Sequence, residues 1–210
     1  MPRTSRSTDE VARVKERILN AAIGIIAERG FSRLSMRSLA AAIGMTAANI
    51  YNYYGNKDEL YLAIQTAGFR ELHARFAGAR DREKTPLKQI RAIMMEYISY
   101  GTSNPDCYNI IFSMDTPKYA DYKNTRIEAV AFAEKKAGLD LIDITRPVVA
   151  DLLRKKGKSA AGAWKKTVQA WIMLHGIVSL LNSRVLQEVA GDSGRFIDQS
   201  MKDAVDYLLS

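Results

Sequence analysis

The chain has 210 residues, of which 47% are hydrophobic, and a formal net charge of +8. That length suits one large domain or two small ones, and the apolar content is too high for a disordered chain. A single cysteine, Cys107, excludes a disulfide framework and a Cys-based zinc site, and the two histidines, His73 and His175, are too far apart in sequence to suggest a His-cluster metal site.

The positions of capping residues, prolines and glycines along the chain predict a succession of helices and no strand. A capping residue, often followed by an acid or by Pro, marks most of the expected starts, and Gly marks several ends. Apolar residues that recur every three or four positions fill the stretches between these marks. We expect helices at 8–29, ended by Gly30; about 35–43, capped by Ser35; 46–53, capped by Thr46; 57 to about 79; from Pro86, Pro105, Pro117 and Pro147; about 160–188; and after Gly194.

A domain boundary is expected near residue 56, between a basic three-helix unit, residues 1–56, and a larger helical body, residues 57–210. Residues 1–57 hold nine Lys or Arg and four Asp or Glu, a formal net charge of +5. A basic end suits a polyanion, either nucleic acid or an anionic membrane. A solvated basic surface with no such partner is the alternative.

Two short helices joined by a three-residue turn with Gly44 predict a helix-turn-helix between residues 31 and 60. The second helix of such a unit enters the DNA major groove, which is about 12 Å wide. Among its first residues, Asn49 suits adenine or a phosphate, whereas Ala47 and Ala48 can offer only methyl contacts.

Phenol hydroxyls and an ammonium at a helix end suit phosphate oxygens, which fix the register of a protein on DNA. Tyr51, Tyr53 and Lys57 fit this role, and Arg37 is the best candidate for a bidentate contact with guanine. Tyr54 is expected in the core. The candidate DNA-binding residues are Ser35, Arg37, Thr46, Ala47, Ala48, Asn49, Tyr51, Tyr53 and Lys57.

The segment 164–181, read as a helix, is apolar on most of its faces. From residue 170 onward only His175, Gly176 and Ser179 interrupt the run of apolar residues. A helix of this kind is buried on more than one side. One side can face the core and the other a partner subunit, and Gly176 and Ser179 are small enough for two helices to cross closely. The pattern therefore leaves one side of this helix available to a partner subunit.

Four short motifs stand out between residues 39 and 60: Leu39-Ala40, Gly44-Met45-Thr46, Ile50-Tyr51-Asn52-Tyr53-Tyr54 and Gly55-Asn56-Lys57-Asp58-Glu59-Leu60. At these motifs the sequence resembles the TetR family of bacterial transcriptional regulators, and the resemblance covers roughly residues 11–64. Tyr53 stands where His is commoner in that family, and Tyr54 where Phe is commoner, so the contact of Tyr53 with a phosphate stays an open question. The spacing of Trp171 from His175-Gly176 resembles a C-terminal domain type of the same family.

The resemblance implies an all-α fold whose last two long helices form a four-helix dimer interface. Two reading helices would then lie in successive major grooves, about 34–36 Å apart or a multiple of it. It also implies an effector pocket among the Met and aromatic side chains of the middle helices, with ordinary core as the alternative. The candidate ligand-binding residues are Tyr97, Tyr108, Phe112, Met114, Trp171 and His175.

No constellation of catalytic residues is found. Gly157-Lys158-Ser159 looks like the end of a phosphate-binding loop, but Leu152 stands where that motif needs Gly, so we assign a basic turn. Cys107 has no histidine near it in sequence. We expect no enzyme, no cofactor and no metal. No apolar run is long enough to span a bilayer and no signal-peptide core is present, so the expected compartment is the cytoplasm.

These observations predict a homodimeric, ligand-responsive transcription factor, most simply a repressor, bound to a palindromic operator in double-stranded DNA. A small-molecule effector of apolar character would favour a different tilt of the helix from Lys57 to about Ala79 and so release the DNA. No membrane partner is expected. The alternative is a helical small-molecule or lipid-binding protein whose basic end contacts a membrane or a protein, without sequence-specific DNA binding.

Overall fold

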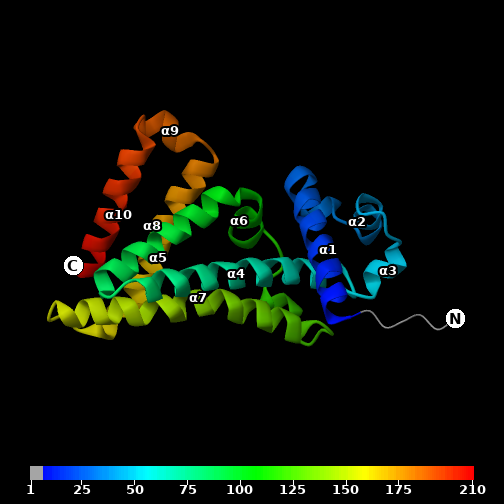
Figure 1. The fold of residues 1–210 in the computed structure, drawn as a ribbon, viewed down its shortest axis with the longest axis horizontal. Coiled ribbons are helices and arrows are strands. Elements are labelled where there is room, and N and C mark those ends of the chain that lie inside the picture. Colours follow the sequence, from blue (N-terminus) through cyan, green and yellow to red (C-terminus); the bar gives the residue numbers. More distant parts are fainter. Residues whose placement is uncertain (1–6) are drawn as a thin grey trace. The chain divides into compact units, whose positions relative to one another are not determined.

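The computed structural model describes residues 7–210, so Arg3 and Arg6, two of the nine basic residues counted in the N-terminal segment, lie outside the described residues. The fold is all-α, as predicted, and the described residues form no strand (Figure 1). No helix among them is long and apolar enough to cross a membrane. The helices are α1 Thr8–Arg29, η1 Phe31–Arg33, α2 Met36–Ala42, α3 Ala47–Tyr51, α4 Lys57–Arg82, α5 Pro86–Ser103, α6 Pro105–Phe112, η2 Tyr119–Tyr122, α7 Glu128–Lys155, η3 Ala160–Gly162, α8 Ala163–Asn182, α9 Val185–Ala190 and α10 Ser193–Leu209.

The chain divides into two compact units. The first comprises the residues up to Ala67 together with Asn109–Glu134, and the second comprises Gly68–Tyr108 and Lys135–Ser210. Packing in the first unit extends beyond the expected boundary at residue 56, because Tyr61 of α4 and Ile110 of α6 belong to its core. The functional division at residue 56 stays a prediction.

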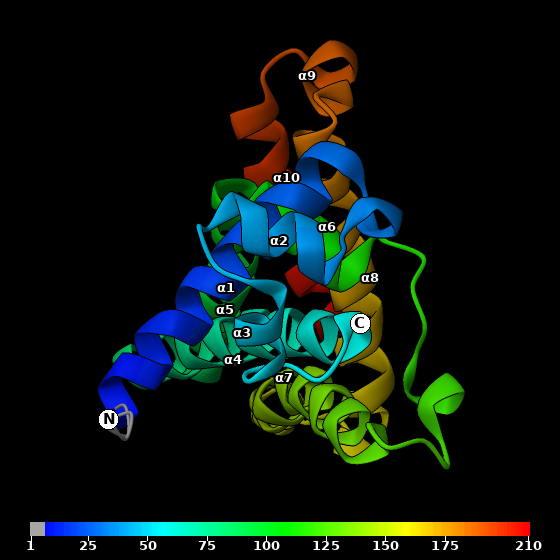
Figure 2. The same cartoon turned by 90° about the vertical axis from the view of Figure 1, so that its right-hand side faces the viewer.

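The three N-terminal helices share one core in the first unit. Ile18 of α1, Leu39 of α2 and Ile50 of α3 are fully buried there, and α1 contacts α2, which contacts α3 (Figure 2). Gly30 ends α1 with φ +79°, a conformation that glycine adopts without strain. Tyr54 is 6% exposed, which confirms its predicted place in the core.

Two proline-based predictions were wrong. No α-helix starts at Pro117, and the hydroxyl of Thr116, expected as the cap, instead donates to Tyr61 Oη at 3.1 Å. Pro147 does not begin a helix but lies inside α7. It lies on an exposed part of that helix, so water can satisfy the carbonyl that loses its N–H partner four residues earlier.

Three other helix limits also differ from the predictions. The expected helix over 160–188 is interrupted at Arg184, whose φ of +62° separates α8 from α9. Helix α3 ends at Tyr51 rather than Tyr53. The last helix begins at Ser193, where the Asp192 carboxylate accepts the N–H of Arg195 at 3.0 Å, so Gly194 lies in its first turn.

Close packing of α5 against α8 organises the second unit. Gly101 of α5 is buried, and a Cβ at this position would collide with side-chain atoms of Val178 and Tyr108. The side-chain amide of Asn182 donates to the Gly101 carbonyl at 3.0 Å. Only glycine permits this approach, which brings Tyr97, one turn before Gly101, to the side chains of α8.

Candidate nucleic-acid interface and effector site

The first helix of the helix-turn-helix, α2, is fixed by its own cap. The N–H of Ser38 donates to Ser35 Oγ at 3.0 Å, and the N–H of Ser35 donates to Ser38 Oγ at 3.1 Å. This reciprocal pair satisfies two backbone donors that a helix start would otherwise leave unpaired. Arg37, the second residue of α2, is exposed. The cap therefore sets the direction in which α2 presents Arg37.

The predicted reading helix, α3, presents small and polar side chains to solvent. Thr46 caps it by accepting the N–H of Asn49 at 3.2 Å. Ala48 and Tyr51 are exposed, Tyr51 by 53% of its surface, whereas Asn49 is half-buried and the next residue, Ile50, anchors the helix in the core. The exposed side of α3 is free of bulky residues at its start, as close approach to a base edge requires.

Tyr53 and Lys57 are less free than Tyr51. Tyr53 is half-buried and packs against the core of the first unit. The ammonium of Lys57 lies 4.0 Å from the centroid of the Phe31 ring, and that ring is 4.6 Å from the ring of Tyr61. The Phe31 face therefore holds the Lys57 cation at the start of α4, near one position, by a cation–π contact.

In the second unit, four of the six candidate ligand-binding residues form one hydrogen-bonded cluster. The Trp171 indole donates to Tyr97 Oη at 3.0 Å. The hydroxyls of Tyr97 and Tyr108 are 3.0 Å apart, and Tyr108 Oη lies 2.6 Å from His175 Nδ1. These residues come from three helices, α5, α6 and α8. We call the four residues the polar cluster.

One direction in the polar cluster is fixed by chemistry. An indole N–H can only donate, so Tyr97 accepts from Trp171. Either hydroxyl of the Tyr97–Tyr108 pair can donate to the other, and His175 Nδ1 accepts from Tyr108 when the imidazole carries its hydrogen on Nε2. The cluster is thus a chain of hydrogen bonds from the Trp171 indole to the His175 imidazole.

Burial favours the neutral form of every titratable group in the polar cluster. It raises the pKa of Tyr108 to about 12. Burial, and then the neighbouring Tyr108 hydroxyl, raise the pKa of Tyr97 well above its ordinary value. Burial also lowers the pKa of His175 below its ordinary 6.5. At neutral pH the cluster is therefore uncharged, and it suits a polar but neutral group on an apolar ligand.

Phe112 and Met114 are not part of this cluster. Both belong to the segment Asn109–Glu134 of the first unit, and Met114 packs against the core there. Sequence reasoning missed Phe76, whose ring centroid lies 6.5 Å from that of Tyr97. Because Phe76 lies on α4, far from Tyr97 in sequence, no local pattern pointed to it.

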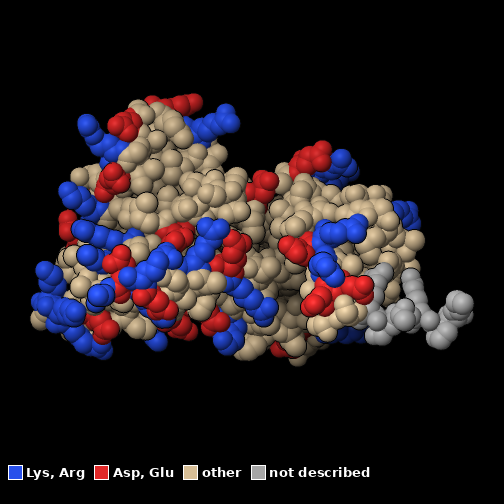
Figure 3. Space-filling model, viewed as in Figure 1, with Lys and Arg blue, Asp and Glu red and all other residues tan. Residues whose placement is uncertain are grey.

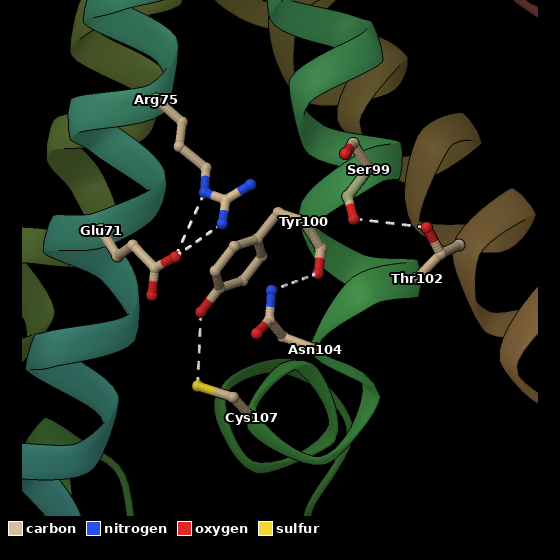
Figure 4. A network of polar contacts seen from close by, with 7 residues as sticks. All are labelled: Glu71, Arg75, Ser99, Tyr100, Thr102, Asn104 and Cys107. Atoms are coloured by element: carbon tan, nitrogen blue, oxygen red, sulfur yellow. Dashed lines mark hydrogen bonds and ion pairs between the residues drawn. The ribbon is translucent and has the colours of Figure 1, made fainter.

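A second polar network joins α4, α5 and α6 in the second unit (Figure 4). Arg75 pairs with Glu71 at 2.8 Å, and its guanidinium lies 5.3 Å from the centroid of the Tyr100 ring. Tyr100 Oη is 3.3 Å from Cys107 Sγ. Burial raises the pKa of the Cys107 thiol, so at neutral pH the thiol is protonated and a poor nucleophile. This network holds helices together and shows no feature of a reactive cysteine.

A helix-turn-helix in one unit and a partly buried polar cluster in a second helical unit are typical of the helix-turn-helix class of regulators. Residues 18–64 match the bacterial regulatory proteins of the tetR family, and residues 90–204 match the tetracyclin repressor-like C-terminal domain. The chain belongs to the TetR family of bacterial regulatory proteins. The resemblance stated from the sequence motifs is therefore confirmed.

Individual relatives agree with this family. The HTH-type transcriptional repressor Rv1474c of Mycobacterium tuberculosis is 34% identical over 83 residues, which are 40% of this chain and 41% of that protein. The chain spans about half the length, or less, of most of the curated relatives it matches, and 69% of an uncharacterized HTH-type transcriptional regulator from Haemophilus influenzae.

Solved structures share the fold. A protein of unknown function from Rhodococcus sp. RHA1 is 19% identical, with a TM-score of 0.72 over 100% of this chain and 97% of that chain. AibR, solved in complex with isovaleryl coenzyme A and operator DNA, is 22% identical, with a TM-score of 0.60 over 79% of this chain and 85% of that chain.

Proposed function

We propose that the protein is a transcriptional repressor that binds a palindromic operator as a homodimer and releases it when a small-molecule effector binds. Such a protein acts in the cytoplasm, where the DNA is, and catalyses no reaction. The exposed start of α3, held in a capped helix-turn-helix, is the observation that carries this proposal. The name of the Mycobacterium tuberculosis relative supports repression rather than activation.

The proposed contacts divide into two kinds. Tyr51, Tyr53 and Lys57 touch phosphates and supply affinity, while Arg37 and the start of α3 read bases. Ser35 and Thr46 already use their hydroxyls as caps, so their contribution is to place the helix starts against the DNA backbone. Ala47, Ala48 and Asn49 complete the reading surface.

Selection of duplexes from a random DNA pool by the purified protein tests this proposal. Neutralising Z phosphates predicts that log affinity falls against log salt concentration with a slope near −0.9Z. Enrichment of a two-fold symmetric sequence would support the repressor. Negligible binding of any duplex at low salt would favour the alternative, a helical lipid-binding or small-molecule-binding protein.

The exposed face of α8 supports the proposed dimer. Ile172 and Leu180 are 57% and 42% exposed, although both are large and apolar. Between them lies Gly176, where an added Cβ would meet nothing within 4 Å. A glycine inside a helix costs about 1 kcal/mol relative to alanine, and no contact among the described residues 7–210 explains its use here. Close approach of a partner helix would explain both the glycine and the exposed apolar residues.

The polar cluster is the proposed effector site. Trp171 and His175 are only half-buried, so an effector could reach their polar atoms, while Phe76 and the ring faces of Tyr97 and Tyr108 offer apolar contact. AibR, whose complex holds isovaleryl coenzyme A and operator DNA, supports a small-molecule effector in a protein of this fold. An effector that takes a hydrogen bond of the cluster would change how α6 is held.

Helix α6 is suited to carry that change to the first unit. Tyr108 of α6 is bonded to His175, and two residues later the Ile110 carbonyl accepts the Tyr61 hydroxyl of α4 at 2.7 Å. The same helix is therefore tied at one point to the proposed effector site and at another to the helix that bears Lys57. We infer that an effector acts through this short segment to change the tilt of α4.

A further inference from the structure

Arg17, one of the nine cations in residues 1–57, donates a hydrogen bond to a backbone carbonyl of the first unit. Arg17 of α1 donates from Nη2 to the Ile43 carbonyl at 2.8 Å, across 26 positions of sequence. Arg17 was counted with the basic surface that suits DNA. The contact shows that its guanidinium reaches the turn of the helix-turn-helix.

Ile43 is the C-cap of α2, where carbonyl groups lack partners within the helix. The negative end of the helix dipole also lies here, so a guanidinium is a well-matched donor. Gly44 follows with φ +65°, and the N–H of Met45 closes the turn on the Ala40 carbonyl at 2.9 Å. Helix α3 begins at Ala47, soon after this turn.

We propose that Arg17 is a positioning residue for DNA reading, an inference that rests on the proposed function. Arg17 lies next to Ile18, which is fully buried and anchors α1 in the core. The bond to Ile43 therefore ties the turn to a fixed helix and sets the angle at which α3 leaves it. Arg17 acts through Ile43 rather than through a phosphate.

The salt dependence of DNA affinity distinguishes a positioning residue from a residue that contacts a phosphate. Base reading depends on the orientation of α3, whereas non-specific affinity depends on the number of phosphates neutralised. Removal of a positioning residue lowers affinity for the selected operator more than affinity for an unrelated duplex. Removal of a phosphate contact weakens both alike and flattens the salt slope by about 0.9.

The test uses the full chain with Arg17→Met, which keeps the length of the side chain and removes its donors. Arg13→Met is the matched control, because Arg13 is exposed and lies one turn earlier on the same helix. Dissociation constants are measured for the selected operator and for an unrelated duplex over a series of salt concentrations. Melting temperatures of all variants are recorded alongside.

We expect Arg17→Met to lower the ratio of specific to non-specific affinity by about tenfold, the loss of one charge-assisted hydrogen bond, with the salt slope unchanged. Arg13→Met should leave that ratio unchanged. Equal weakening on both duplexes with a flatter slope, or no effect at all, would overturn the proposal. A wild-type chain that selects no duplex would instead refute the repressor function itself.

Arg17→Lys keeps the test decisive if Arg17→Met does not fold. Lysine retains the charge but replaces the planar guanidinium by a single ammonium with different geometry. A positioning role predicts a smaller but measurable loss of the specificity ratio for this variant. An Arg17→Lys variant with an unchanged ratio would contradict it.

Discussion

At the scale of single residues, the structure holds Lys57 in one place for its proposed phosphate contact. Its ammonium rests on the face of Phe31, which in turn packs on Tyr61. A long side chain held in this way loses less conformational entropy when it binds a phosphate. The same contact explains why a lysine at a helix start, where a cation opposes the helix dipole, is tolerated.

Replacement of Lys57 by alanine should weaken binding to every duplex and reduce the salt slope by about one unit, because one phosphate contact is lost. Arg37→Ala is the comparison, since the loss of a base-reading arginine should cost about 1–3 kcal/mol of binding free energy at one operator position. Fluorescence titration at several salt concentrations measures both. A Lys57→Ala variant with an unaltered slope would remove Lys57 from the phosphate contacts.

Below neutral pH, His175 should reduce stability. Burial lowers its pKa in the folded protein below the 6.5 of the unfolded chain, so the unfolded chain binds more protons once the pH falls below about 6.5. The contribution of neutral His175 to the free energy of unfolding is complete at neutral pH. It is lost as the pH falls from there toward the pKa of His175 in the folded protein. Urea unfolding at pH 7 and at pH 5 measures the loss.

His175→Gln isolates this contribution, because glutamine has no titratable group. The loss of stability between pH 7 and pH 5 should be smaller in this variant than in the wild type. His73→Gln removes the other histidine and serves as the control. Equal losses in His175→Gln and the wild type would show that the neutral imidazole is not required by the fold.

At the scale of elements, Gly101 and Gly176 occupy helices for different reasons. Gly101→Ala should lower the free energy of unfolding by about 1–3 kcal/mol, because the new Cβ collides with Val178 and Tyr108. Gly176→Ala should cause no such loss, since its Cβ meets nothing within 4 Å in the part of the chain that the structure describes. Urea unfolding at one protein concentration compares them; equal destabilisation would contradict the packing of α5 on α8. Weaker self-association of Gly176→Ala would agree with the proposed interface.

The bond from Tyr61 to Ile110 ties α4 to α6 at a fully buried position. Tyr61→Phe keeps the ring on Phe31 but leaves the Ile110 carbonyl and the Thr116 hydroxyl without this partner. We expect the free energy of unfolding to fall by about 1–3 kcal/mol, the cost of unsatisfied buried polar groups. Chemical denaturation checks this value, and a neutral substitution would show that α6 is held by packing alone.

At the scale of the whole molecule, positive charge gathers in two stretches. Residues 1–57 carry +5, and residues 154–166 hold six Lys or Arg and no acid. Figure 3 shows Lys and Arg side chains gathered where the C-terminal end of α7 lies in Figure 1. Three of its members have structural partners, because Arg154 pairs with Asp151 at 2.6 Å, Lys158 donates to the Ser210 carbonyl at 2.8 Å and Lys166 donates to the Tyr207 carbonyl at 2.9 Å. The segment Gly157-Lys158-Ser159 follows α7 in a turn in which Gly157 has a φ of +71°, in agreement with the predicted basic turn.

Self-association should depend on the exposed apolar face of α8. Leu180→Glu would place a charge in the proposed interface, where burial of an unpaired carboxylate is costly. We expect monomers in sedimentation velocity experiments and a loss of operator affinity, since two linked reading heads bind far more tightly than one. An intact Leu180→Glu dimer would place the interface elsewhere.

Much of the fold was predictable because its signals are local. Ser35 and Thr46 cap α2 and α3 as expected, and Gly30 ends α1. Capping needs only groups within three or four residues, so it can be read from a single stretch of chain. The prediction failed at Pro117 because Thr116 uses its hydroxyl on a distant residue.

The amino-acid sequence by itself determined the starts of α1 to α6, the helix-turn-helix and the family, because these depend on short-range spacing. Only the tertiary structure decided which polar groups meet. Tyr97 lies 78 residues from His175 in the chain, and Arg17 lies 26 from Ile43. Such pairs depend on how buried faces pack, for instance on the space left by Gly101, and the local pattern around either partner does not specify them.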